Sequence, residues 1–138
     1  MRRLFYCLLP AAGCLLFAGC GSRLNTVVGK VTLADGSPLT RGMIVFDGMM
    51  DGKTVSPRGE IKADGTFVLG TLKPGDGVPT GKYRALINPL DSSEVPDEQK
   101  HIPFDYKYCR LDTSGLEFTV EPGKNEFTIK LDPPRHRR

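Results

Sequence analysis

The sequence predicts an all-β protein, an antiparallel sandwich of about seven short strands that follows an N-terminal signal segment. Three observations support this. Apolar and polar residues alternate with a period of two, most clearly over residues 116–120 and 127–131. The 16 Gly and 11 Pro fall between short apolar runs rather than in one tract, as tight turns require. No segment after residue 25 has a sustained helical period.

Residues 1–19 have the pattern of a removable signal segment. Arg2 and Arg3 give it a short positive start, and a mainly apolar run extends from Leu4 to Phe17. A run of this length is shorter than the roughly 20 residues of a membrane-spanning helix, but it suits a signal-peptide core. We therefore leave this segment out of the fold and expect an exported protein.

The end of that segment, Leu16-Phe17-Ala18-Gly19-Cys20, resembles the bacterial lipobox, in which small residues precede a cysteine. Small residues let the backbone enter a peptidase cleft. The resemblance implies that the thiol of Cys20 receives a diacylglyceryl group, so that membrane lipid is its partner. Phe17 stands where the motif usually carries Leu. The alternative is an ordinary signal peptide cut after Ala18 or Gly19, with Cys20 as an incidental thiol.

The mature chain should contain a tether (residues 20–25), a sandwich domain (26–132) and a disordered basic tail (133–138). Its first strand is expected over residues 26–33, with Val27 and Val31 on the buried face. A turn follows at residues 34–38, where Asp-Gly supplies a left-handed position at low steric cost.

The next elements are read from alternation and Asp-Gly pairs. A strand over residues 42–47 carries Ile44 and Phe46 on one face, and residues 47–57 are predicted as loop. Asp64-Gly65, between two alternating segments, predicts a hairpin with a type I′ turn.

The remaining strands are expected at residues 81–88, 116–120 and 127–131, the last two closed as a hairpin by residues 122–125. Number and spacing match an immunoglobulin-like or prealbumin-like sandwich. A small closed barrel is the alternative. Residues 89–108 are polar, rich in Pro and without a clear period, so a connection of this length is mobile or functional.

Several segments resemble carboxypeptidase regulatory-like domains. Residues 28–33, 35–39 and 42–46 are similar to the opening of that domain, residues 64–69 to its aspartate-glycine-aromatic turn, and residues 79–84 to its proline-glycine-tyrosine strand entry.

Residues 102–103, 106–108 and 113–116 resemble a block found in small lipoproteins of planctomycete-type bacteria. Together the resemblances cover about residues 26–131. They imply an exported, seven-stranded prealbumin-like sandwich. The family name refers to an accessory domain beside a peptidase, so the resemblance implies no peptidase activity, and the fold alone does not fix function.

The sequence offers no recognisable catalytic constellation. A Ser or Cys nucleophile needs a base within reach, and the two His, His101 and His136, lie in no known motif. Once the signal is removed only Cys20 and Cys109 remain. With Cys20 acylated, Cys109 has no partner within the chain, and we expect a free thiol. We predict a protein that is not an enzyme.

Zinc-type spacing of Cys and His is absent from the sequence. Asp47, Asp51 and residues 91–98 could offer oxygens to calcium, but the Asp-Gly pairs elsewhere already have an explanation as turns. We therefore predict no metal and no cofactor. The net charge of the mature chain is nearly zero apart from the basic tail. The sequence therefore gives no indication of a nucleic-acid-binding surface across the domain.

Phe104, Tyr106 and Tyr108 alternate, so all three could face one way. If exposed they would form a stacking platform for sugar or peptide. The alternative, favoured by the scarcity of other large residues, is that they cover the edge of the sandwich. The leading hypothesis is a lipid-anchored, non-enzymatic module of the cell envelope, structural or binding, with an envelope protein or polysaccharide as partner. The second is a carbohydrate- or peptide-binding domain that uses the 89–108 loop.

Overall fold

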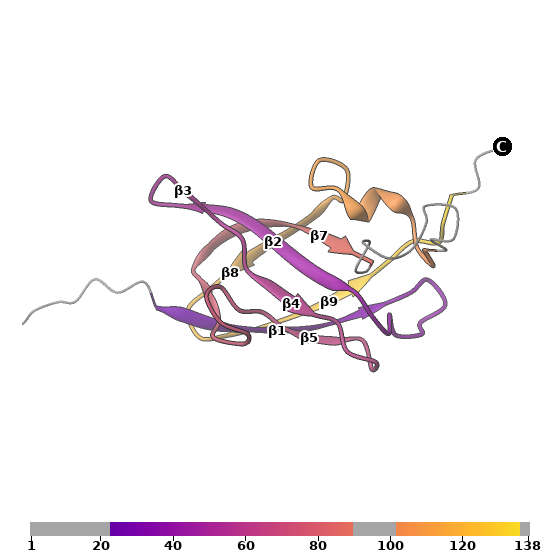
Figure 1. Cartoon of the computed structure of the whole chain (residues 1–138), viewed down its shortest axis with the longest axis horizontal. Helices are drawn as coiled ribbons and strands as arrows, with labels where there is room; N and C mark the ends of the chain where they lie inside the picture. The colour runs from indigo at the N-terminus through magenta and orange to yellow at the C-terminus, as the bar shows by residue number, and fades with distance from the viewer. Residues whose placement is uncertain (1–22, 90–101, 136–138) are drawn as a thin grey trace, which may run out of the picture.

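The computed structural model describes residues 23–89 and 102–135, which form two packed β-sheets (Figure 1). The predicted all-β sandwich is confirmed. The expected signal segment, Cys20 and His101 lie outside the described residues. The elements are β1 (Leu24–Thr32), β2 (Met43–Met50), β3 (Lys53–Val55), β4 (Arg58–Glu60), β5 (Thr66–Val68), β6 (Val78–Pro79), β7 (Gly81–Asn88), the 3₁₀ helix η2 (Tyr106–Cys109), β8 (Leu116–Val120) and β9 (Lys124–Lys130).

The first sheet is built around β1. Strands β5 and β6 pair with it in antiparallel fashion, β6 at its start and β5 at its middle. Strand β9 runs parallel to it over seven paired positions, from Thr26 opposite Lys124 to Thr32 opposite Lys130. The first and last strands of the domain therefore lie side by side, and this parallel pair is a departure from the purely antiparallel sandwich that the sequence predicted.

The second sheet has β2 and β7 at its centre. They pair over six positions, from Met43 opposite Asn88 to Gly48 opposite Tyr83. Strand β8 continues the sheet beyond β7, while β3 and β4 share the other edge of β2. Every pairing in this sheet is antiparallel.

The core between the sheets consists of the residues that the period of two placed on the inner faces. Val27 and Val31 in β1, Ile44 and Phe46 in β2, and Ala85 in β7 are all fully buried. The other buried apolar residues are Leu39, Ile61, Phe67, Leu69, Val78, Tyr83, Ile87, Phe104, Tyr108, Val120, Ile129 and Leu131. Leu116, Phe118 and Phe127 are partly buried against this core. Alternation thus predicted the inner face correctly in each long strand.

The type I′ turn lies in a different place from the predicted one. Asp51 has a φ of 49° and Gly52 a φ of 75°, and these two residues join β2 to β3 with Met50 opposite Lys53. A two-residue loop with both φ values positive is the type I′ arrangement. The segment predicted as loop, residues 47–57, therefore contains the tight hairpin.

At Asp64-Gly65 only the glycine has a positive φ, 83°. Gly65 N–H donates to Lys62 O and Lys62 N–H to Thr66 O, so the turn has three residues and ends in a left-handed glycine. The Asp64 carboxylate accepts from the N–H and the hydroxyl of Thr66. Strand β4 pairs with β2 and β5 with β1, so the turn connects the two sheets. The two arms of the turn still meet through an antiparallel bridge between Arg58 and Gly70.

The predicted hairpin of the last two strands is also wrong in its pairing. Strand β8 joins β7 and strand β9 joins β1, so their connection crosses from one sheet to the other. Asn125 accounts for this because its side chain accepts from Glu121 N–H at 2.9 Å and donates to Glu121 O at 2.8 Å. These bonds replace the first rungs of a ladder between the two strands and leave β9 free to pair elsewhere.

Gly29 tests the packing on the inner face of the first sheet. It lies on the inner face of β1 between Phe67 and Phe127, and a Cβ there would collide with the Phe67 ring and with the Phe127 carbonyl oxygen. We expect Gly29→Ala to lower the free energy of unfolding by about 1–3 kcal/mol because of this overpacking. Urea denaturation measures it. The exposed neighbour Lys30 serves as control, with Lys30→Ala changing stability by less than about 0.5 kcal/mol. Equal midpoints for the two variants would contradict this packing.

Candidate functional site

The three aromatic residues predicted as a platform do not share a face. Phe104 is 1% exposed and Tyr108 is 5% exposed, whereas Tyr106 is 66% exposed. Residues 106–109 form η2, and a helical turn cannot keep the two-residue alternation of a strand. The edge-covering alternative therefore holds for Phe104 and Tyr108, whose rings meet edge to face with centroids 6.4 Å apart.

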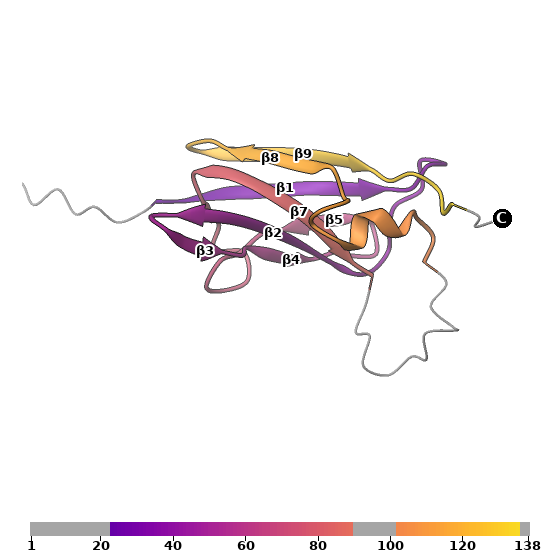
Figure 2. The ribbon, with the colours of Figure 1, turned by 90° about the horizontal axis from the view of Figure 1, so that it is seen from above.

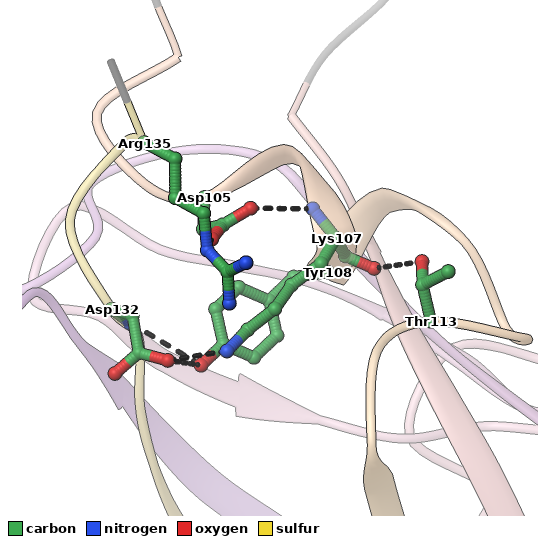
Figure 3. Close-up of polar contacts among 6 residues, drawn as sticks. All are labelled: Asp105, Lys107, Tyr108, Thr113, Asp132 and Arg135. Atoms are coloured by element: carbon green, nitrogen blue, oxygen red, sulfur yellow. Dashed lines mark hydrogen bonds and ion pairs between the residues drawn. The ribbon is translucent and has the colours of Figure 1, made fainter. Parts of the chain in front are cut away.

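Asp105 starts this turn. Its carboxylate accepts from the Lys107 N–H at 3.0 Å, and its carbonyl accepts from the Tyr108 N–H at 3.2 Å. At the other end, the Lys107 carbonyl accepts from the Thr113 hydroxyl at 2.8 Å (Figure 3). Capping at both ends holds a short helix that would not be stable alone.

Asp132, just after β9, joins this turn to the first sheet. Its carboxylate accepts from the Tyr108 hydroxyl at 2.9 Å and from the Lys107 ammonium, as Figure 3 shows. The backbone adds a bond from the Asp105 N–H to the Asp132 carbonyl at 2.9 Å. The Lys107 ammonium also lies 4.8 Å from the centre of the Tyr108 ring. Helix η2 is thus fixed to the end of the last strand.

Arg135 continues the same cluster into the segment predicted as a disordered tail. Its Nε lies 2.8 Å from Oδ2 of Asp105, a side chain only 9% exposed (Figure 3). The two groups form an ion pair but not a hydrogen bond, since Oδ2 of Asp105 has no hydrogen-bond partner among the described residues. The positive charge of Arg135 therefore compensates the negative charge of the Asp105 carboxylate. Residues 136–138 lie outside the described part of the chain.

The ion pair between Asp132 and Lys107 shifts the pKa of each group in the direction that favours its charged form. Hydrogen bonds from Lys107 and then Tyr108 lower the pKa of Asp132. The hydrogen bond to Asp132 raises the pKa of Lys107. Since the Asp132 side chain is 59% exposed, water screens much of this attraction. The cluster serves to position η2 and the chain end.

Cys109, at the end of η2, is a free thiol and is half-buried. Burial raises the pKa of Cys109, which keeps the thiol protonated at neutral pH. A nucleophilic cysteine needs the opposite shift, because the thiolate is the reactive form. The side chain packs against the core. Cys20, His101 and His136 lie outside the described residues.

A second candidate site lies on the outer face of the second sheet. It is an open groove of about 640 Å³ over β2, β3, β7 and β8, lined by Asp47, Gly48, Met49, Thr54, Lys82, Tyr83, Arg84, Glu117, Phe118 and Thr119. Asp47, Arg84 and Glu117 are neighbours in register and form one row of alternating charge across three strands. The closest approach in this row is 3.9 Å, between Arg84 and Asp47.

This groove offers ionic and hydrogen-bonding groups beside apolar surface. Its volume falls within the range of small-molecule pockets, but its charged row is open to water. Such a surface suits a polar or charged partner that packs against the outer face of the second sheet. This groove was not among the predicted sites, because alternation along a strand indicates which face is buried and not what the outer face binds. The polar residues that alternate with the buried ones in the same strands could have indicated the groove; they are Lys82, Arg84, Glu117 and Thr119.

Among residues 23–89 and 102–135, no three His, Cys, Asp or Glu side chains lie together in a way that could hold a metal ion. Within the same ranges, no helix is both long and apolar enough to cross a membrane.

Comparison with known proteins adds little to this geometry. No family model and no curated protein sequence matches the chain. Among solved structures, a 9R-lipoxygenase from Cyanothece PCC8801 is similar at 15% identity and a TM-score of 0.41. The match covers 80% of this chain and 16% of the lipoxygenase chain. A similarity at this level carries no argument about activity.

The Tyr108 hydroxyl tests the role of the η2 cluster. Tyr108→Phe keeps the buried ring but removes the bond to the Asp132 carboxylate and a second contact of 3.3 Å to the Asp132 N–H. We expect a loss of about 1–2 kcal/mol in the free energy of unfolding, measured by urea denaturation. Tyr106→Phe, at an exposed ring with no hydrogen bond within the described residues, is the control. A loss equal to that of the control would show that the cluster does not hold η2.

Asp132 should make stability depend on pH. Because its pKa is lowered in the folded state, its contribution is present at neutral pH and is lost as pH falls through that lowered value. Asp132→Asn should therefore reduce the unfolding midpoint at pH 7, and its difference from the unaltered protein should shrink below about pH 4. Glu126→Gln, an exposed carboxylate on β9 without an ion pair among the described residues, is the control. A difference that grows on acidification would reverse the sign and overturn this account.

Proposed function

We propose that this chain is a lipid-anchored, non-enzymatic module of the bacterial cell envelope, with a structural or binding role. The observation that carries the proposal is the lipobox-like segment 16–20, which follows an apolar run and stands four residues before β1 begins at Leu24. Acylation at Cys20 would place a folded domain directly at the membrane surface. More than one acyl chain would be needed there, because a single chain of myristoyl length binds only marginally.

We also propose membership of the carboxypeptidase regulatory-like group. The two-sheet sandwich supports this. So do the structural roles of two residues in the segments that resemble the family. Gly65 occupies the left-handed position of the turn before β5, and Tyr83 of the proline-glycine-tyrosine entry donates to the Pro79 carbonyl at 2.9 Å. In this family the domain accompanies other activities, which fits a module without chemistry of its own.

The non-enzymatic part of the proposal rests on what the polar residues do. Asp64 and Asp105 bond to backbone N–H groups within two residues along the chain. Asp132 holds Lys107 and Tyr108. Each of these carboxylates therefore serves local structure.

A binding role would use the groove over β2, β7 and β8 in preference to the 89–108 loop. Of the three aromatic residues offered for stacking, only Tyr106 is exposed, and one ring does not make a platform. The groove presents Lys82, Arg84 and Glu117 on one rigid surface. A polar envelope component, protein or polysaccharide, is the partner class that this surface fits.

Lipidation is tested on the native amino terminus. We expect mass spectrometry of the chain isolated from membranes to show cleavage after Gly19 and acyl groups on Cys20. Cys20→Ala should lack the acyl mass and the membrane association. Cys109→Ala removes the one free thiol among the described residues and should keep both, which makes it the matched control. An unmodified thiol at Cys20 in the membrane-derived protein would refute the anchor.

A further inference from the structure

One end of the sandwich is distinguished by where its loops lie. The start of β1, the β2–β3 hairpin and the connection between β8 and β9 lie at the same end in both views, and the loop between β5 and β6 lies towards it (Figures 1 and 2). Helix η2 and the C-terminal segment lie at the opposite end. We call the first of these the N-terminal end and define it by residues 23–25, 49–54, 70–82 and 120–124.

The N-terminal end carries the two most exposed large apolar side chains of the described residues, Leu72 at 85% and Met49 at 73%. Leu72 is held outward by its loop. The Asp76 carboxylate accepts from the N–H groups of Thr71 at 2.7 Å, Leu72 at 3.2 Å and Lys73 at 3.0 Å. Although desolvation opposes it, this backbone bonding lowers the pKa of Asp76, so the loop stays capped at neutral pH. The leucine is presented to the outside by a fixed turn.

The charges of the two ends differ as well. The N-terminal end has five cations, Arg23, Lys53, Lys73, Lys82 and Lys124, against three acids, Asp51, Asp76 and Glu121. None of the five is in an ion pair within the described part of the chain. At the opposite end Lys107, Arg110 and Arg135 are paired with Asp132, Asp112 and Asp105. Unpaired cations beside exposed apolar side chains are what an anionic lipid surface attracts.

The length of chain before β1 limits where this end can go. Three residue steps separate Cys20 from Arg23, and covalent geometry lets them span at most about 11 Å. The tether cannot become longer by unpairing of the first residues of β1, because hydrogen bonds of Asn25 hold the start of that strand in place. Its amide donates to Val78 O at 3.1 Å and Thr80 Oγ1 at 3.0 Å, and its oxygen accepts from Gly123 N–H at 3.1 Å. An anchor at Cys20 therefore holds Arg23, where the N-terminal end begins, within about 11 Å of the lipid-bearing residue.

We propose that the N-terminal end is a membrane-contact surface for anionic phospholipid. Leu72 and Met49 enter the interface, and the surrounding lysines contact lipid phosphates. This proposal rests on the lipid anchor at Cys20 and adds an orientation to it: the sandwich stands on this end, with η2 pointing away from the bilayer.

Two label positions at opposite ends test the orientation. In the lipidated chain carrying Cys109→Ser, an environment-sensitive fluorophore is attached at Leu72→Cys or at Tyr106→Cys, which is the matched control because Tyr106 is 66% exposed at the far end. The protein is reconstituted in vesicles of phosphatidylglycerol and phosphatidylethanolamine. We expect a blue shift and quenching by a lipid-borne nitroxide at position 72 only. Water-like emission at both positions, or a response only at 106, would overturn the proposal.

Charge reversal tests the lysines. Lys53→Glu, Lys73→Glu and Lys124→Glu together should reduce the response at position 72 by at least half. Arg41→Glu, Lys62→Glu and Lys130→Glu, an equal charge change away from this end, should leave it unchanged. Equal effects of the two sets would refute a specific contact. A failed anchor is recognised separately, because the chain would then show no acyl mass and would not float with the vesicles, whereas a failed orientation leaves an acylated, floating protein with both labels in water.

Discussion

An aromatic stack joins the two sheets, and the rest of the fold depends on it. Phe46 of β2 stacks on Phe118 of β8 with centroids 5.1 Å apart and planes 4° apart. Phe127 of β9, in the opposite sheet, meets Phe118 at 4.7 Å and Phe46 at 6.3 Å. Phe46 is fully buried and Phe118 and Phe127 are partly buried, so the stack adds large apolar area to the core of a small domain without a disulfide among the described residues. Close packing continues on the inner face of β1, where a Cβ at Gly29 would meet the Phe67 ring and the Phe127 carbonyl oxygen.

The period of two predicted which side chains face inward, but it contained no information on which sheet each strand joins. Strands β8 and β9 alternate as clearly as any in the chain, and a short turn separates them, yet they belong to different sheets. The deciding interaction is the one between the Asn125 side chain and the Glu121 backbone, which has no signature in hydrophobic patterning. The alternating pattern along a strand predicts which residues are buried, whereas the choice of partner strand depends here on hydrogen bonds made by a single polar side chain.

The five Asp-Gly pairs show why turn types were only partly predictable. Gly48 lies within β2, where a Cβ would come within 2.6 Å of the Tyr83 ring. Asp51-Gly52 forms a type I′ turn, Asp64-Gly65 a three-residue turn, and Asp76 caps the loop that precedes it. The same dipeptide therefore serves close packing, two kinds of turn and a loop cap. The candidate site was less predictable still, because the alternation of Phe104, Tyr106 and Tyr108 suggested one shared face, whereas residues 106–109 form η2.

The two ends of the sandwich satisfy their charges in different ways, and this difference bears on how a partner could reach the groove. At the η2 end Lys107, Arg110 and Arg135 are paired with carboxylates of the domain, whereas the five cations of the N-terminal end make no ion pair among the described residues. The groove over β2, β7 and β8 begins beside the N-terminal end, since Met49, Thr54 and Lys82 belong to both. A domain that stood on this end would open its groove close to the lipid surface. The partner best placed to fill it would then itself be held in the envelope, because a ligand confined to the same surface meets the groove at a higher effective concentration than one in free solution.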